Sequence, residues 1–462
     1  MAQYLKNAVY QMFLTFGIAM KIWTYYLVNV KIEKRGSERG KIMPSYSTYT
    51  HEELDRLYTE CKEQYAHFQS MGLSLDMSRG KPGADQLALS AGLVNVLSPD
   101  DFIAANGTDC RNYGGIDGIP EMKQLFSEIL QVRSDEILVG GNSSLSLMYE
   151  CASYFAKFSA AAKTGGTKKF LCPSPGYDRH FAICEYLGIE MITIPMTSEG
   201  PDMDEVRKHI TDPTVIGIWC VPVFSNPQGY VYSDEIIQAI AKLSPASPDF
   251  RIYWDNAYAI HPFEGEVPQI ANLLRECESA GTQDNVLIFT SFSKITFPGA
   301  AVAAVAASPI NLDLLRKHLI IQTIGPDKIN QLRHVRFFGD LAGVHGHMKK
   351  HADILRPKFE IVLSQLEKNL AGKGIAQWSI PKGGYFVSFD TLPNCAKRTI
   401  AICAEAGLVM TNAGATFPYG KDPQDKNIRI APSFPPVEQL EIAMQLFCLA
   451  VEMAAIEVIL WK

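Results

Sequence analysis

Seven short apolar segments, separated by stretches with helical spacing, constrain the fold of this chain most strongly. They are residues 136–141, 168–175, 190–196, 215–222, 251–258, 285–292 and 300–308. Their apolar residues run together instead of alternating with polar ones, which is typical of strands covered on both faces. The pattern predicts an α/β fold in which a large domain contains a mostly parallel seven-stranded sheet.

The sequence changes character after about residue 335. Helices are expected over 345–370, 395–406 and 436–458, and short strands over 383–390 and 427–433. We expect a large domain over 91–334 and a smaller α+β domain built from 43–90 and 335–462. A first helix over 51–70 should begin at a capping box of Thr50 and Glu53. A chain of 462 residues is also too long for one small core.

Residues 1–42 form an N-terminal extension with a segment that resembles a membrane anchor. Residues 7–30 are nearly long enough to span a bilayer, although Lys21 lies in their middle. We favour a non-native extension, with Met43 as the original start. If the segment inserted, the basic residues after it would keep the rest of the chain in the cytoplasm. A membrane is therefore expected as a partner only in that case.

Composition excludes several other classes of protein. The net charge is -6 and no block of Lys and Arg is present, so a nucleic-acid partner is not expected. The ten cysteines form no CxxC pair, which indicates reduced, buried thiols in a cytoplasmic protein. His347 and His351 lie one helical turn apart, but no nearby ligand completes a metal site, and we interpret them as part of a solvated helix face.

Polar residues follow the predicted strands, at the edge of a parallel sheet where function collects. Lys294 stands in SFSKITFPGA among small neutral neighbours. Burial there would lower its pKa and favour the neutral, nucleophilic amine. Asp255 ends the segment RIYWD, where a carboxylate is costly unless it is paired. It could keep a heteroaromatic nitrogen protonated, as pyridoxal 5'-phosphate (PLP) requires.

The neighbouring segments supply further candidate ligands. Tyr258 and Asn226 could donate hydrogen bonds to a phenolic oxygen, and Tyr177 could stack on a flat ring. Ser143 and Ser144 open a helix after a strand, so they either bind a phosphate or simply cap that helix, and Ser291 could add a hydroxyl. Arg429 points inward from an alternating strand and needs a carboxylate partner, from either the protein or a substrate.

Together these residues resemble the class I/II aminotransferases, which are fold-type I PLP enzymes. Asn226 in NPQG, Asp255 with Tyr258, Lys294 in SFSK, and Arg429 occur in the order and with the spacing of that family. The resemblance covers about 43–462. The segments DMSRGKP, RNYGG and KITFPGA narrow it to the aspartate-aminotransferase-like subgroup, which is related to the catalytic half of MocR-type regulators. No winged-helix domain fits before residue 43, so an enzyme is expected.

The resemblance implies a role for each matching residue. Lys294 would form the internal aldimine and then shuttle a proton, Asp255 would pair with the ring nitrogen, and Arg429 would bind the substrate α-carboxylate. Tyr113 would reach the phosphate in a neighbouring subunit, which implies a homodimer with shared active sites. Asn226 and Tyr258 would hydrogen-bond the ring oxygen, and Tyr177 would stack on the ring. Gly80 would let the backbone approach the substrate, which Asn226 would also contact. The phosphate would be bound by Ser143, Ser144 and Ser291.

The chain departs from the family pattern at one position. Val302 stands eight residues after Lys294, where many relatives carry a phosphate-binding arginine. A second arginine for a distal substrate carboxylate is also not evident, and Arg79, Lys81 and Arg111 are candidates.

The leading hypothesis is transamination of aspartate (or glutamate) with 2-oxoglutarate or another 2-oxo acid, by a ping-pong mechanism. Two alternatives use the same fold: an aminotransferase for aromatic or neutral amino acids, and a PLP β-lyase. A catalytically silent dimeric binding module is the third alternative. The cofactor-type positions named above argue against that last reading.

Overall fold

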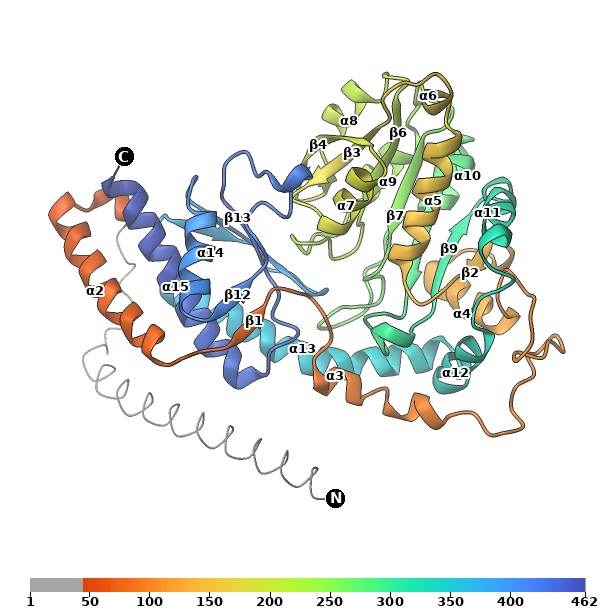
Figure 1. Cartoon of the computed structure of the whole chain (residues 1–462), viewed down its shortest axis with the longest axis horizontal. Helices are drawn as coiled ribbons and strands as arrows, with labels where there is room; N and C mark the ends of the chain where they lie inside the picture. Colours follow the sequence, from red (N-terminus) through yellow and green to blue (C-terminus); the bar gives the residue numbers. More distant parts are fainter. Residues whose placement is uncertain (1–44, 462) are drawn as a thin grey trace.

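The computed structural model describes residues 45–461, and the expectations for residues 1–42 lie outside this range. Figure 1 shows two groups of elements, a large sheet with its helices and a smaller group that contains both ends of the described chain. The long helix α13 (Leu341–Leu370) runs between the two groups.

The large sheet has eight strands in the order β2-β9-β8-β7-β6-β3-β4-β5. Its strands are β2 (Ile137–Val139), β3 (Lys169–Ser174), β4 (Glu190–Thr197), β5 (Gly200–Pro201), β6 (Val215–Cys220), β7 (Arg251–Asp255), β8 (Val286–Ser291) and β9 (Ala303–Ala307). All seven predicted strands are present. The central strands β4, β3, β6, β7 and β8 pair in parallel, whereas β9 runs antiparallel to β8 and β2. Sequence reasoning missed only β5, which has two residues.

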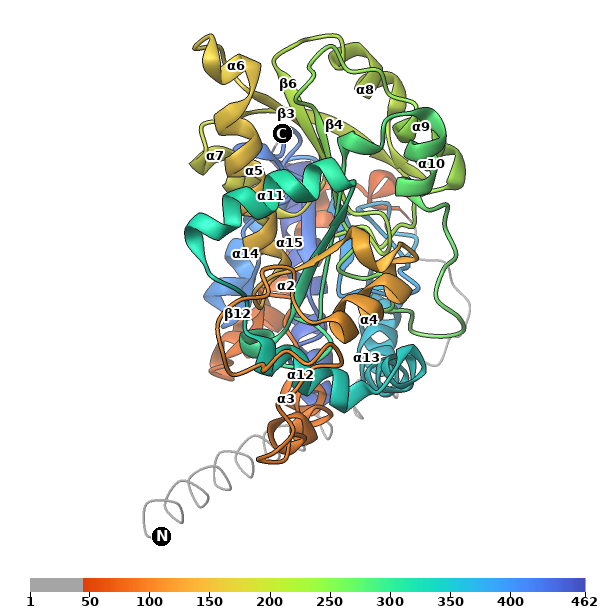
Figure 2. The same ribbon diagram turned by 90° about the vertical axis from the view of Figure 1, so that its right-hand side faces the viewer.

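Helices cover both faces of this sheet, which explains why its strands do not alternate (Figure 2). One face packs residues such as Met122, Ile237 and Leu274 into a continuous apolar core, and the other packs Leu147 and Leu312. The helices are α4 (Pro120–Leu130), α5 (Ser144–Phe158), α6 (Ala160–Lys163), α7 (Asp178–Tyr186), α8 (Met203–His209), α9 (Asp234–Ala241), α10 (Leu273–Ala280), α11 (Pro309–Gln322) and α12 (Lys328–Phe338).

The smaller group combines segments from both ends of the chain. Its elements are α2 (His51–Ser70), β1 (Leu75–Met77), α3 (Ala84–Ala88), β10 (Ala376–Trp378), β11 (Val387–Thr391), α14 (Ala396–Glu405), β12 (Leu408–Met410), β13 (Asn427–Ile430) and α15 (Val437–Leu460). Strand β1 pairs in parallel with β12, and β10, β11 and β13 form an antiparallel sheet. The predicted capping box of Thr50 and Glu53 is present at the start of α2.

Helix α13 contacts both cores, so it connects the two groups mechanically. Val344 and Met348 pack with the large sheet, and Leu355 and Phe359 pack with the smaller group. Among residues 45–461, α15 is the one helix that is long and apolar enough to cross a membrane. Most of it is buried in the core of the smaller group, as in core helices of other proteins.

The predicted burial of the cysteines is confirmed, whereas the prediction for two histidines is wrong. All ten cysteines are buried and free. His347 and His351, interpreted above as part of a solvated helix face, are buried on α13. The two lysines between them are exposed, and this polar stretch concealed that the histidines occupy the buried side of the helix.

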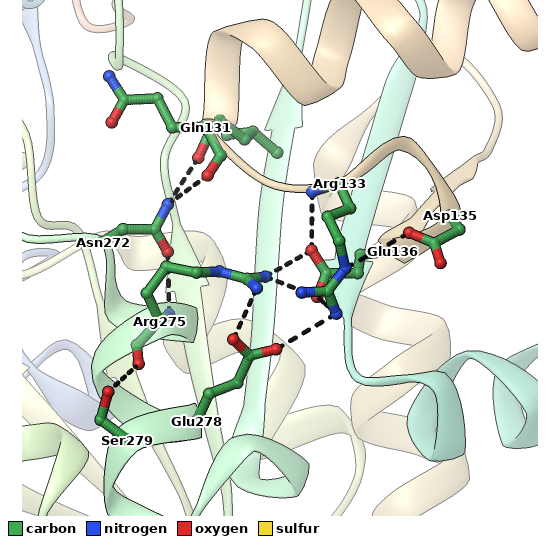
Figure 3. Close-up of polar contacts among 9 residues, drawn as sticks. Gln131, Arg133, Asp135, Glu136, Asn272, Arg275, Glu278 and Ser279 are labelled. Carbon is green, nitrogen blue, oxygen red and sulfur yellow. Dashed lines mark hydrogen bonds and ion pairs between the residues drawn. The ribbon is translucent and has the colours of Figure 1, made fainter.

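A buried carboxylate fixes the entry to strand β2 (Figure 3). Glu136 is 1% exposed and accepts a hydrogen bond from the Arg133 backbone N–H at 2.8 Å. Its oxygens also lie 2.5 Å from Arg133 Nη2 and 2.5 Å from Arg275 Nη2 on α10. Glu278 contacts the same two arginines from the outside, at 3.3 and 2.6 Å. Glu136 therefore ties the chain before β2 to α10.

We expect Glu136→Gln to lower the free energy of unfolding by about 2 kcal/mol, because it leaves two arginines without their buried counter-charge. The matched variant Glu278→Gln removes a partly exposed carboxylate from the same cluster and should cost less than about 1 kcal/mol. Urea denaturation of both variants measures the difference. Equal losses would show that burial of Glu136 does not matter.

Candidate active site

The carboxyl ends of four parallel strands deliver the residues of the candidate site. Tyr177 follows β3, Asn226 lies in the loop after β6, Asp255 ends β7, and Lys294 follows β8. Because these strands are parallel neighbours, their carboxyl ends lie at one edge of the sheet (Figure 1). Arg429 reaches this edge from β13 of the smaller group, where it hydrogen-bonds Asn226 at 3.3 Å.

Asp255 is a buried carboxylate with one oxygen paired and one free. It is 4% exposed, and Oδ2 lies 3.1 Å from His180 Nε2. The imidazole of His180 stacks on Trp219, with ring centroids 4.3 Å apart, and so is held in place. Oδ1 is buried and has no hydrogen-bond partner. A buried, unpaired carboxylate oxygen is costly, which indicates that this atom meets a donor from outside the chain.

Lys294 is a half-buried amine whose environment favours the neutral form. Its Nζ lies 4.8 Å from the centre of the Tyr258 ring. Burial lowers the pKa of Lys294, the positive charge of Arg429 lowers it further, and the negative charge of Asp255 opposes both. The same surroundings act on Tyr258, whose pKa is raised by burial, by Tyr177 and by Asp255. These residues therefore share one electrostatic environment.

Arg429 is a buried guanidinium with one edge occupied. Its Nη1 lies 2.7 Å from Asp178 Oδ1, so the protein supplies an internal carboxylate partner. Nε is buried and has no partner, and Nη2 has only a 3.5 Å contact with Thr411. The free edge can therefore bind a second carboxylate in the bidentate manner typical of arginine.

The guanidinium of Arg429 also packs over the ring of Phe386. The Phe386 ring lies 4.9 Å from Arg429 Cζ and packs edge-on against Tyr258. Residue 80 must be a glycine for the ring to occupy this position, because a Cβ at residue 80 would lie 2.3 Å from the ring. The structure thus places Gly80 beside the site through a packing contact with Phe386.

The predicted phosphate-binding serines form a second cluster, at the start of α5. Ser143 is the N-cap of α5, where its hydroxyl accepts from the Leu145 N–H, and Ser144 is buried in the first turn. Ser291 Oγ hydrogen-bonds Ser293 at 3.0 Å, and Ser293 Oγ donates to the Asn142 carbonyl at 3.1 Å. The end of β8 is thereby joined to a helix N-terminus, which favours anions.

Two other predicted positions have no side-chain hydrogen bond to these clusters among residues 45–461. Tyr113 is 82% exposed. Val302 is buried in the apolar core beside the large sheet, so the hydrophobic effect accounts for its identity.

The candidates for a second substrate-binding cation have local partners or face solvent. Arg111 pairs with Asp109 at 2.7 Å and stacks on Phe102, and Lys81 lies over Phe434. Arg79 is exposed. None of the three has a hydrogen bond or ion pair with Lys294 or Arg429 among residues 45–461.

Sequence reasoning missed His180 and Asp178, which contact Asp255 and Arg429 directly. Both lie in the first turn of α7, and His180 stands three residues after Tyr177, on the same helix face. That spacing was a usable signal. The stacking of His180 on Trp219 depends on the order of strands in the sheet, which the sequence does not reveal.

The site combines a carboxylate that can accept a hydrogen bond, a guanidinium that can donate hydrogen bonds, and an amine with a lowered pKa. Asp255 Oδ1 can accept a hydrogen bond from an N–H group, and the free edge of Arg429 can bind a carboxylate. Lys294 can act as nucleophile or base. These are the parts needed to hold an amino acid beside a protonated heteroaromatic ring.

Comparison with known proteins assigns the family. A family model for aspartate amino-transferase matches residues 49–461. The aspartate aminotransferase of Corynebacterium glutamicum is 42% identical over 426 residues, which cover 91% of this chain and 99% of that protein. A solved aspartate transaminase structure from the same species has a TM-score of 0.88 at 42% identity, and covers 90% of this chain and 100% of that one.

A more distant likeness agrees with the predicted relation to MocR-type regulators. An uncharacterised HTH-type transcriptional regulator of Bacillus subtilis is 27% identical over 285 residues, which cover 58% of this chain and 60% of that protein. The predicted class of enzyme and the predicted fold are both confirmed. The chain belongs to the aspartate aminotransferase family and is a fold-type I aminotransferase.

Proposed function

We propose that this aminotransferase uses PLP and moves the amino group of aspartate (or glutamate) to a 2-oxo acid such as 2-oxoglutarate, by a ping-pong mechanism. The observation that carries the proposal is a pair of unpaired buried atoms, Asp255 Oδ1 and Arg429 Nε, in two residues whose charges both act on Lys294. The first atom suits a ring N–H, and the second suits a substrate carboxylate.

The residues present fit PLP. Asp255 Oδ1 would hold the protonated ring nitrogen, Asn226 and Tyr258 the ring oxygen, and Tyr177 the ring face. Ser143, Ser144 and Ser291 would bind the phosphate together with the N-terminus of α5. Lys294 would attach the cofactor covalently through Nζ. When bound, PLP supplies an electron sink for the electrons left on the substrate Cα.

The chain's own residues prepare the reaction in three ways. The free edge of Arg429 orients the substrate by its α-carboxylate, and Asp178 and Phe386 keep the guanidinium in place. Burial lowers the pKa of Lys294, which favours an amine that can take up a proton and return it within the site. His180 holds Asp255 Oδ2, which leaves Oδ1 free to accept from the ring nitrogen when the cofactor is bound.

We also propose a cytoplasmic homodimer with shared active sites. Tyr113 projects from the surface and would reach the phosphate bound by the partner subunit. Helix α11 and the residues after it expose apolar side chains that a second copy could cover: Ile310, Ile320, Ile321 and Ile324. A sedimentation mass of a single chain would remove this part of the proposal.

A panel of amino donors with 2-oxoglutarate tests the substrate assignment. Half-reaction spectra should show aspartate and glutamate converting the cofactor at least about ten-fold faster than alanine or phenylalanine, because an additional carboxylate contact contributes about 1.5–3 kcal/mol. Equal rates for all donors would remove the aspartate assignment. Fastest turnover with phenylalanine would favour the aromatic alternative. Ammonia or pyruvate released without an acceptor would favour a β-lyase.

A further inference from the structure

A buried polar cluster contacts the backbone of Lys294 and Ile295. It consists of Gln86, His347, His351 and Tyr385, which come from α3, α13 and the loop before β11. All four side chains are buried, with exposed fractions from 0 to 6%. None of them has a role in the proposed reaction.

The cluster holds two consecutive backbone carbonyl groups. Tyr385 Oη lies 3.0 Å from the Lys294 carbonyl oxygen and donates to it. His347 Nε2 and His351 Nε2 each lie 2.9 Å from the Ile295 carbonyl oxygen. Ser90 Oγ lies farther from the same oxygen, at 3.4 Å. A carbonyl oxygen has two lone pairs, so the two shorter contacts are sufficient to satisfy it.

The hydrogen-bond directions follow without ambiguity. The Gly83 N–H donates to Gln86 Oε1, so Gln86 Nε2 is the donor toward Tyr385 Oη at 2.8 Å and His351 Nδ1 at 3.0 Å. His351 Nδ1 must then be an acceptor, and its Nε2 carries the ring hydrogen that the Ile295 carbonyl accepts. His347 Nε2 must carry a hydrogen as well, because it faces the same carbonyl oxygen, which can only accept.

A proton added to His351 would destroy this pattern, because its Nδ1 would become a donor facing the Gln86 amide N–H. The two Nε2 atoms lie only 3.2 Å apart, so a charge on either ring also opposes a charge on the other. Burial, followed by the neighbouring His347, lowers the pKa of His351 to about 4. Two charged groups also act on the pair, Lys350 on His347 and Asp85 on His351.

We propose that Gln86, His347, His351 and Tyr385 form a neutral clamp that positions Lys294 by fixing the carbonyl groups of residues 294 and 295. The clamp residues act through the backbone and touch no reacting atom, so they are positioning residues. The inference rests on the proposed role of Lys294. Because α3, α13 and Tyr385 also contribute to the smaller group, the clamp joins that group to the reactive lysine.

Kinetics of the PLP-loaded enzyme test the clamp. Tyr385→Phe removes only the hydroxyl, and should lower kcat about ten-fold with KM changed less than about two-fold, since a small displacement of a reacting group slows chemistry more than binding. His351→Leu removes both contacts of the imidazole and should lower kcat about 100-fold. His351→Gln, whose amide can still donate to the Ile295 carbonyl, should recover part of that loss.

The control is His345→Gln, which changes the exposed histidine on the same helix and should leave kcat unchanged. Wild-type kcat in Tyr385→Phe and His351→Gln would overturn the clamp, as would a rise in KM without a fall in kcat. If His351→Leu does not fold, as judged by its thermal melt, Tyr385→Phe alone decides.

A second measurement separates failure of the clamp from failure of the proposed function. The apoprotein is mixed with PLP, samples are reduced with borohydride at intervals, and labelling of Lys294 is followed by peptide mass. The clamp predicts slower labelling in Tyr385→Phe and His351→Gln than in the wild type and His345→Gln. Equal rates would overturn it. An absence of label on Lys294 in the wild type would instead refute the proposed function.

Discussion

Lys294→Ala should lose transamination almost completely, with kcat lower by at least about 10⁴-fold. The variant removes the nucleophile and the proton carrier together, and proton transfer alone contributes about 10²–10⁴-fold in enzymes of this kind. No neighbouring amine can replace it, since the residues flanking Lys294 are small, hydroxylated or apolar. Steady-state assays with aspartate and 2-oxoglutarate measure the effect.

Two further variants make this result specific. Lys294→Arg retains a long basic side chain but cannot supply a neutral amine, so we expect it to be as inactive as Lys294→Ala. Lys242→Ala removes an exposed lysine at the end of α9 and should behave as the wild type. More than a tenth of wild-type activity in Lys294→Ala would contradict the assignment.

Asp255→Asn should lower kcat by about 10–10³-fold while the fold is retained. A carboxylate close to a basic nitrogen raises that nitrogen's pKa by about 1–3 units, and a neutral amide of the same shape does not. The amide oxygen can still accept from His180, so the stack on Trp219 should persist. Because the substrate carboxylate binds elsewhere, KM for the amino donor should change little.

The comparison for this variant is Asp353→Asn, which changes an exposed carboxylate on α13. We expect it to match the wild type in kcat and in thermal melting temperature. Full kcat in Asp255→Asn would contradict the proposed pairing of Oδ1 with the ring nitrogen. If it lost activity only through unfolding, its melting temperature would fall in parallel.

Local patterns were sufficient to predict much of the fold. Apolar runs gave all seven long strands of the large sheet, and the Thr50–Glu53 pair gave the first residue of α2. The two-residue strand β5 was missed because so short a segment carries no periodicity. The buried face of α13 was misjudged at His347 and His351, since polar neighbours concealed two side chains that bond to a distant backbone.

The sequence was sufficient to predict those site residues whose chemical type and position at a strand end indicate a function. Lys294, Asp255, Tyr258, Asn226 and Arg429 are brought to one edge of the sheet as expected. Their supporting contacts were not predictable, because these contacts join segments far apart in sequence. Asp178 is 251 residues from Arg429, and Tyr385 is 91 residues from Lys294.

We propose above that Lys294 is the residue that carries the cofactor. Reduction of the PLP-loaded wild-type protein with borohydride, followed by proteolysis and peptide mass mapping, tests this most directly. We expect a phosphopyridoxyl group on Lys294 and on no other lysine. A stable label on a different lysine with Lys294 unmodified, or no label at all, would contradict it.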